Sequence, residues 1–173
     1  GADGRLFVAE ANLNTVSVID TATGKVTETL SASLYPGAPP GSMPNSLALT
    51  PDGTVLFVAN ANNNNLAVFD VRVPGRAQSL GYIPVGWFPT SVRMTADGRT
   101  LVVANGKGLV SLANPHGPET HAPKSVDEYI GRLLLGTVSL IRWPKEADRA
   151  AQLGAWSRSA YACCPLDAAA SVR

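Results

Sequence analysis

Short apolar segments, separated by turn residues, follow one another along most of the chain. Residues 55–59 are apolar at every position, a pattern typical of a strand that is covered on both faces of its sheet. Residues 15–20 are rich in β-branched side chains, which favour strands. These patterns predict strands at 6–10, 15–20, 25–30, 46–50, 55–60, 66–70, 77–84, 91–95, 100–105 and 137–142. The chain is therefore expected to consist mainly of β-structure.

The predicted strands belong to a repeated unit. Residues 44–60 and 89–105 align position by position, and their Asp-Gly turns, at Asp52 and Asp97, lie 45 residues apart. A shorter version of the unit begins at Asp3. Repeats of this length, with four strands joined by short turns, are typical of β-propeller blades. We predict an all-β fold: a partial β-propeller of about three four-stranded antiparallel blades, which form an incomplete ring, with a C-terminal helix.

A long insertion interrupts the third repeat. About thirty residues, 106–135, follow the strand that ends at Asn105, whereas residues 62–65 make the same connection in the second repeat. Loops of this length inside a compact repeat often have a function. Because the first part of the insertion carries few large apolar groups, we expect residues 111–126 to be an exposed loop that becomes ordered against a partner domain. The apolar residues 129–135 should pack back onto the blade.

The composition changes after the third repeat. Acidic residues after Pro144 favour a helix N-terminus, and Leu153 and Trp156 fall on one helical face, so we predict a helix at 145–161. A closed ring typically needs about four to eight blades, and the chain is therefore expected to be part of a longer protein. The predicted organisation is residues 1–143 as propeller blades, with the insertion at 106–135, and residues 144–173 as a helical tail or linker toward a further domain.

Charge and cysteine content exclude several classes of function. The formal net charge is +1, and acidic and basic residues are spread along the chain, which argues against a nucleic-acid partner because such a surface needs clustered Lys and Arg. No apolar run approaches the length of a membrane span, about 18 residues. Cys163 and Cys164 are adjacent, a spacing that suits neither a disulfide framework nor a redox or zinc site. Both are expected to be ordinary free thiols.

The insertion carries the candidate chemistry of the chain. A catalytic zinc ion needs three protein ligands in a fixed geometry, and nothing in the sequence around the two histidines of the insertion provides one. The Gly-Lys-Gly run at 106–108 lacks the remaining residues of a phosphate-binding loop. Gly106 and Gly108 are expected to let the chain leave its strand. We predict no catalytic set, no metal site and no cofactor. The residues expected to contact a partner domain are Lys107, Asn114, His116 and His121.

Some residues recur at equivalent positions in the repeats. Asp20 and Asp70 follow equivalent strands, and we expect their side chains to accept hydrogen bonds within turns. Three aromatic residues gather near the junction of the second and third repeats. We expect Tyr82, Trp87 and Phe88 to wedge one blade against the next rather than to bind a ligand.

The repeats resemble a known family. Residues 52–70 and 83–89 look like the YVTN-type β-propeller repeat of bacterial surface and periplasmic proteins. Residues 103–108, 114–118, 129–131 and 136–139, together with the tail helix, are similar to bacterial proteins in which such a propeller precedes a phosphoesterase domain of the alkaline-phosphatase superfamily. In that superfamily a Ser or Thr nucleophile works beside two metal ions held by Asp and His, a constellation that this chain does not show.

The resemblance implies a periplasmic or extracellular protein and a non-catalytic scaffold or recognition segment, the accessory part of an exported phosphoesterase. The partner it implies is a phosphoesterase domain in the same protein. Two alternatives remain open. The segment could belong to the phosphoesterase itself, with the insertion at 106–135 lining the active site, or it could be a stand-alone propeller of the surface-layer type. The repeat is more specific for a fold than for a function.

Overall fold

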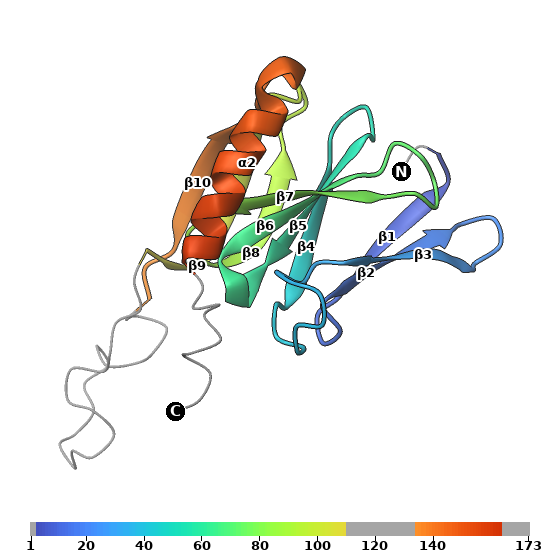
Figure 1. The fold of residues 1–173 in the computed structure, drawn as a ribbon, viewed down its shortest axis with the longest axis horizontal. Helices are drawn as coiled ribbons and strands as arrows, with labels where there is room; N and C mark the ends of the chain where they lie inside the picture. Colours follow the sequence, from blue (N-terminus) through green and yellow to red (C-terminus); the bar gives the residue numbers. More distant parts are fainter. Residues whose placement is uncertain (1–2, 110–133, 164–173) are drawn as a thin grey trace, which may run out of the picture.

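The structure is a computed structural model, and it describes residues 3–109 and 134–163. The expectations for residues 111–126, Asn114, His116, His121 and Cys164 fall outside the described residues. Three antiparallel sheets stand side by side, and one helix lies along the outside (Figure 1). The all-β prediction, a partial propeller with an open ring and a C-terminal helix, is confirmed.

The strands follow one another in chain order within each sheet. The first sheet contains β1 (Arg5–Glu10), β2 (Thr15–Asp20) and β3 (Val26–Ser31). The second contains β4 (Pro44–Leu49), β5 (Val55–Asn60), β6 (Asn65–Asp70) and β7 (Gln78–Pro84), with the short helix η1 (Ala61–Asn63) between β5 and β6. The third contains β8 (Trp87–Met94), β9 (Thr100–Gly108) and β10 (Thr137–Arg142). Every predicted strand is present, although only the second sheet has four strands.

The insertion lies where the repeat places it. Thr137 pairs with Asn105 at the start of β10, just as Asn65 pairs with Asn60 at the start of β6. The connection from β9 to β10 is therefore the counterpart of the short turn in the second sheet. β9 is longer than expected, because Gly108 still pairs with Trp87 of β8. The strand was expected to end at Asn105, and it continues for three more residues. Of the two glycines expected at its exit, Gly108 is the last strand residue, whereas Gly106 lies within β9.

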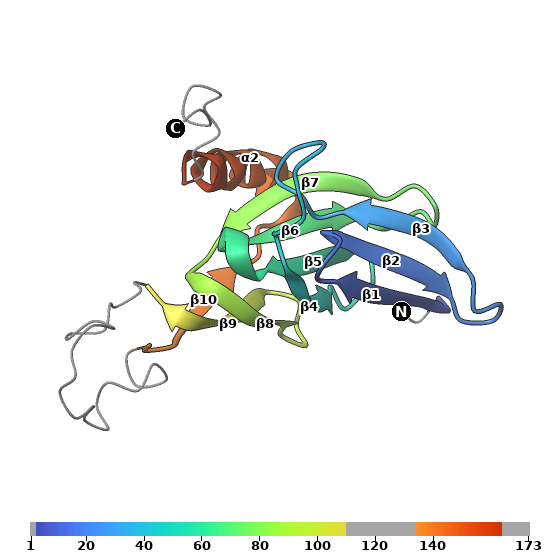
Figure 2. The ribbon, with the colours of Figure 1, turned by 90° about the horizontal axis from the view of Figure 1, so that it is seen from below.

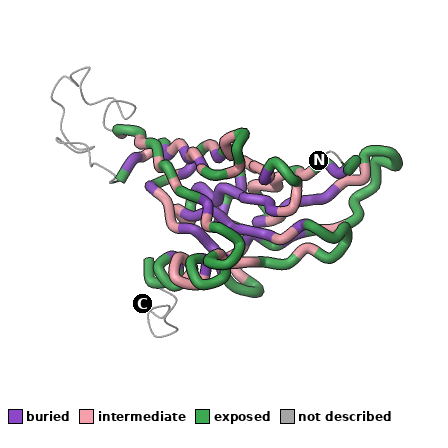
Figure 3. Tube along the Cα trace, turned by 90° about the horizontal axis from the view of Figure 1, so that it is seen from above, coloured by how far each residue is buried: buried purple, intermediate pink, exposed green. Residues whose placement is uncertain are grey.

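Two apolar clusters fill the spaces on either side of the second sheet. Figure 3 shows the buried residues concentrated in these central strands. β5 is buried at all six positions, as its continuous apolar sequence predicts. Leu56 and Val58 pack toward the first sheet, whereas Val55, Phe57 and Ala59 pack toward the third. Alternate side chains of a strand point to opposite faces, so one strand contributes to both clusters.

The C-terminal helix covers the outer edge of the second sheet. α2 (Glu146–Ala162) agrees with the predicted helix at 145–161 and lies against β7 (Figure 2). Ser157 Oγ accepts a hydrogen bond of 2.9 Å from the backbone N–H of Tyr82. A Cβ on Gly81 would lie 2.3 Å from the same oxygen, so the close approach requires glycine. The helix thereby covers the edge of β7, which would otherwise be open, and accepts a hydrogen bond from one of its N–H groups.

Two further expectations have structural outcomes. Of residues 129–135, predicted to pack back onto the blade, 129–133 lie outside the described residues; Leu134 is half-buried and Leu135 is 75% exposed. No helix within residues 3–109 and 134–163 is long and apolar enough to cross a membrane. The division of the chain into domains at residues 143 and 144 stays a prediction.

Substitution of the buried helix residue Leu153 tests the role of α2. Leu153 is 2% exposed and belongs to the cluster shared by the second and third sheets. We expect Leu153→Ala to lower the free energy of unfolding by about 2–5 kcal/mol, measured by urea denaturation, because it opens a cavity. The matched control is Leu13→Ala in a turn, where the side chain is 64% exposed and the expected change is within about 0.5 kcal/mol. Equal effects of the two changes would show that α2 does not stabilise the sheets.

Candidate functional site

The connections between strands gather at two opposite ends of the sheets. The insertion leaves and returns at one of them, called the insertion end, which lies at the lower side of Figure 1. The same end holds the connections at 11–14, 32–43, 61–64 and 85–86, together with the base of the insertion at 106–109 and 134–136. The other end, called the turn end, carries the Asp-Gly turns. Because long loops commonly carry binding residues, the insertion end is the candidate functional site.

In the described ranges, the non-glycine residues with a positive φ all lie at the insertion end. Four non-glycine residues in the described ranges have a positive φ: Asn14 at 58°, Met43 at 55°, Asn64 at 53° and Phe88 at 58°. They occupy two repeat positions. Asn14 and Asn64 directly precede β2 and β6, which are equivalent strands of the repeat. Met43 and Phe88 each directly precede a Pro at the entry to the next unit. Such conformations cost free energy for residues other than glycine, and they gather where a fold holds loops in defined positions.

The two asparagines with a positive φ link neighbouring sheets. Asn14 Oδ1 accepts hydrogen bonds from the backbone N–H groups of Gly41, at 2.9 Å, and Ser42, at 2.7 Å. Asn64 Oδ1 accepts one from the backbone N–H of Phe88, at 2.9 Å. Each side chain thus reaches from a turn of one unit to the loop that enters the next. Asparagine fits both requirements, because it tolerates left-handed backbone and carries an amide oxygen.

A second repeated polar position lies where β1, β5 and β9 reach the insertion end. Asn60 Nδ2 donates to Ala32 O at 2.9 Å and to Asn65 Oδ1 at 3.1 Å. Asn105 Nδ2 donates to two hydroxyls of β10, at 2.9 and 3.3 Å. Both asparagines are almost completely buried. Sequence reasoning missed this role, although the recurring Ala-Asn at 59–60 and 104–105 was a signal for it.

In the first sheet Glu10 takes the same position. Its carboxylate accepts hydrogen bonds from the hydroxyls of Thr15, at 2.5 Å, and Ser17, at 2.9 Å. The hydrogen bond from Thr15, followed by that from Ser17, lowers the pKa of Glu10 below its ordinary value. At this repeat position, the described residues thus carry two buried amides and one carboxylate that is already engaged by its neighbours.

Lys107 is the predicted partner-contact residue that the structure describes. It lies in β9 at the base of the insertion, and its Nζ is 4.8 Å from the ring centroid of Phe88. A cation over an aromatic face is attracted by the quadrupole of the ring. Phe88 is in turn held by its hydrogen bond to Asn64. The cation is therefore placed by a connected series of contacts rather than by chance on a free surface.

The three aromatic residues near this junction do not share one role. Tyr82 is buried, as expected for a wedge, and its hydroxyl donates to Ser33 O in the connection that follows β3. Burial, with a smaller effect of Tyr161, raises the pKa of Tyr82 to about 12. Trp87 is 43% exposed, so the expectation that it wedges two blades together is wrong in this structure. It is the first residue of β8 and pairs with Gly108, the last residue of β9.

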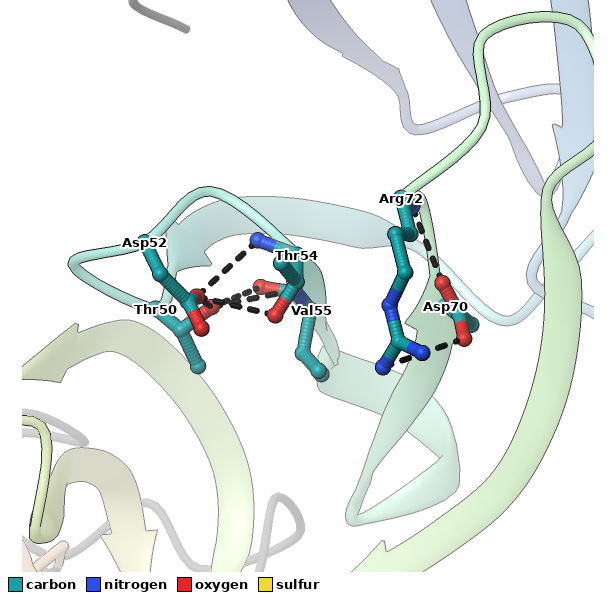
Figure 4. Close-up of polar contacts among 6 residues, drawn as sticks. All are labelled: Thr50, Asp52, Thr54, Val55, Asp70 and Arg72. Atoms are coloured by element: carbon teal, nitrogen blue, oxygen red, sulfur yellow. Dashed lines mark hydrogen bonds and ion pairs between the residues drawn. The ribbon is translucent and has the colours of Figure 1, made fainter.

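The carboxylates at the turn end have structural roles. Asp52 Oδ1 accepts hydrogen bonds from the Thr50 hydroxyl at 2.5 Å and from the hydroxyl and N–H of Thr54 at 2.8 and 3.1 Å (Figure 4). Asp97 repeats this arrangement with the Thr95 hydroxyl and the N–H of Arg99. The hydrogen bond from the preceding threonine is the main cause that lowers the pKa of each Asp.

The predicted turn roles of two other aspartates are confirmed. Asp20 Oδ1 accepts from the N–H groups of Ala22 and Thr23, at 2.9 and 2.8 Å. Asp70 Oδ1 accepts from the N–H of Arg72, at 2.9 Å, and its other oxygen lies 3.7 Å from the Arg72 guanidinium (Figure 4). Within residues 3–109 and 134–163, no three His, Cys, Asp or Glu side chains are grouped to hold a metal ion.

Successive antiparallel sheets of this kind, joined by the same inter-sheet contacts at the same repeat positions, define the β-propeller class of proteins. The chain belongs to the lactonase family of seven-bladed β-propellers, whose sequence model matches residues 3–110. No curated protein sequence matches the chain.

Solved structures agree with this fold. Hydrazine synthase from Kuenenia stuttgartiensis is 29% identical with a TM-score of 0.52, and the match covers 60% of this chain and 26% of that protein. A putative 6-phosphogluconolactonase from Bacteroides fragilis is 23% identical with a TM-score of 0.53 and coverages of 61% and 30%. A second one, from Bacteroides uniformis, is 22% identical with a TM-score of 0.52 and coverages of 59% and 30%. The chain thus spans less than a third of the length of these proteins.

Substitutions of Asn64 separate its backbone role from its side-chain role. Asn64→Gly keeps the left-handed backbone but loses the bond to Phe88, whereas Asn64→Ala loses the bond and strains the backbone as well. We expect Asn64→Ala to be less stable than Asn64→Gly by about 1 kcal/mol in chemical denaturation. Asn12→Ala, in an exposed turn, is the control and should leave stability unchanged. Equal stability of the two Asn64 variants would remove the argument from backbone strain.

Acid should weaken the turn at Asp52. The pKa of this carboxyl is lowered in the folded chain, so its stabilising effect is present above the unfolded value, 3.8, and is lost as the pH falls through the folded pKa. We expect Asp52→Asn to cost about 1 kcal/mol at pH 7, after screening by solvent. The difference from the unchanged chain should shrink below pH 3.8, as measured by thermal unfolding at several pH values. A difference independent of pH would assign the effect to packing instead.

Proposed function

We propose that this chain is the recognition and scaffold part of a longer exported bacterial protein, and that its insertion end contacts a phosphoesterase domain of that protein. The observation that carries the proposal is the placement of Lys107. This cation lies where the insertion leaves β9, over the ring of Phe88, whose backbone N–H is in turn bound by Asn64. A positioned cation beside a long loop suits an acidic surface of a partner domain, because it gives the contact both charge and orientation.

The distribution of carboxylates supports a recognition role. Carboxylates of the turn end are engaged in hydrogen bonds within their own turns, so they hold the repeat together. Amides at the insertion end connect successive sheets and fix the loops between them. The sequence resemblance at 103–108 and 136–139 adds the phosphoesterase neighbour, and the resemblance to the YVTN-type repeat adds the location in the periplasm or outside the cell.

Family membership favours a second candidate, the hydrolysis of a sugar lactone. The family match covers residues 3–110, and two of the similar structures are putative 6-phosphogluconolactonases. A lactone is a cyclic ester, so this reaction differs from phosphoester hydrolysis in its substrate and in the bond that breaks. The two candidates therefore predict different activities.

The experiment compares residues 1–173 with the protein encoded by the full reading frame. We expect the longer protein to hydrolyse p-nitrophenyl phosphate in the presence of zinc, magnesium or manganese, and the chain alone to show no turnover. We also expect trypsin to cut the chain alone first after Lys107 or Lys124, and the longer protein to resist cutting at both sites, because the partner domain would cover them.

Two results would contradict this proposal. Metal-dependent turnover by the chain alone, abolished by His116→Ala or His121→Ala, would place a catalytic site in the insertion. Equal protection from trypsin in both proteins would remove the partner contact. Hydrolysis of glucono-δ-lactone by either protein would support the second candidate instead.

A further inference from the structure

The outer edge of the third sheet is open along β10. In the described residues β10 pairs only with β9. β6, at the same place in the second sheet, pairs with β5 on one side and with β7 on the other. After β10 the chain turns into α2, which bonds to the edge of β7. An open strand edge presents unpaired N–H and C=O groups and is a template for another strand.

A groove runs beside this open edge. Its volume is about 940 Å³, within the range of about 300–1,000 Å³ that is usual for ligand pockets. Residues 140–145 form one wall, and Asp148, Gln152 and Trp156 of α2 form the other. Its lining begins at Leu140 and shares no residue with the insertion end, so it is separate from the candidate site described above. Strand backbone and helix side chains together border a space for an extended peptide.

The exposed and charged side chains of the groove indicate what kind of segment it can bind. Leu140 is 71% exposed on β10, although Val68, at the same repeat position in β6, is completely buried. Arg142 and Lys145 supply two positive charges, and Asp148 supplies one negative charge. An apolar segment that carries a carboxylate near Arg142 complements this lining. Opposite charges directly across two paired strands stabilise the pair.

We propose that β10 binds an extended peptide segment of a partner protein as an added antiparallel strand, with a carboxylate beside Arg142 and an apolar side chain against Leu140. Main-chain hydrogen bonds supply affinity in this mode of recognition, and side-chain pockets supply specificity. The pairing of β6 with β7 in the second sheet indicates the register of the bound segment on β10. Gln78 of β7 lies opposite Asp70 of β6, which is the repeat counterpart of Arg142. The carboxylate of the bound segment takes the place of Gln78.

The probe is a fluorescein-labelled peptide with the sequence of residues 78–84, in which glutamate replaces Gln78 and valine replaces Gly81. Fluorescence anisotropy measures its binding to the whole chain, residues 1–173. We expect Arg142→Glu to weaken binding by about fivefold or more, because it removes an exposed charge pair, worth up to about fivefold, and places a like charge opposite the glutamate of the peptide. Arg76→Glu makes the same charge change in an exposed turn of the second sheet and should leave binding unchanged. Circular dichroism checks that both variants fold.

A charge-swapped probe keeps the test independent of the stability of Arg142→Glu. A peptide with lysine in place of Gln78 should bind Arg142→Glu more tightly than it binds the unchanged chain. Failure of the first peptide to bind the unchanged chain would overturn the proposal, and so would an equal loss of binding in Arg76→Glu. A dimer of the chain that Leu140→Glu dissociates, and that the peptide does not displace, would assign the edge to a second copy instead.

Discussion

Burial of the second sheet on both faces is the constraint on which the described structure depends. A single twisted sheet of this size cannot remove enough apolar surface from water, and repeated units become stable by packing on their neighbours. Here the second sheet is the one with a neighbour on each side, and β5 is buried along its whole length. The first and third sheets each gain one buried face from this arrangement. Leu6 and Val138, on their outer faces, remain largely exposed.

The helix α2 joins the two apolar clusters from outside. Leu153 belongs to the cluster between the second and third sheets, and Ala160, two turns later, belongs to the other. Trp143 anchors the start of this segment: its ring meets Phe57 edge-on at a centroid distance of 4.8 Å, and the Arg149 guanidinium lies over it at 4.9 Å. The polar contacts at the insertion end add direction to this packing. Apolar burial brings the sheets together, and the asparagine side chains set which loop meets which turn.

Much of the fold could be predicted from the sequence, because its signals are local and repeated. The matching Asp-Gly turns at residues 52–53 and 97–98 specify hairpins and their register, and the apolar run at 55–59 indicates a strand buried on both faces. The contacts of the candidate site were harder to predict from the sequence. The bond from Phe88 to Asn64 joins residues 24 apart, and Trp87 is exposed although it stands in an apolar, aromatic stretch of sequence. Contacts between units depend on how the sheets pack, which no local pattern contains.

Because a distant segment covers the edge of β7, this edge is uncovered for a time while the chain is being synthesised. The Ser157 hydroxyl that accepts the N–H of Tyr82 lies 75 residues further along the sequence. At a synthesis rate of about 5–20 residues per second, β7 emerges roughly 4–15 s before the helix that covers its edge. During that interval the nascent strand can pair with other extended chains, as uncovered edges do. Gly81 lies within β7 and Pro84 is its last residue. Both residue types weaken strand pairing, so the strand itself limits association until α2 arrives.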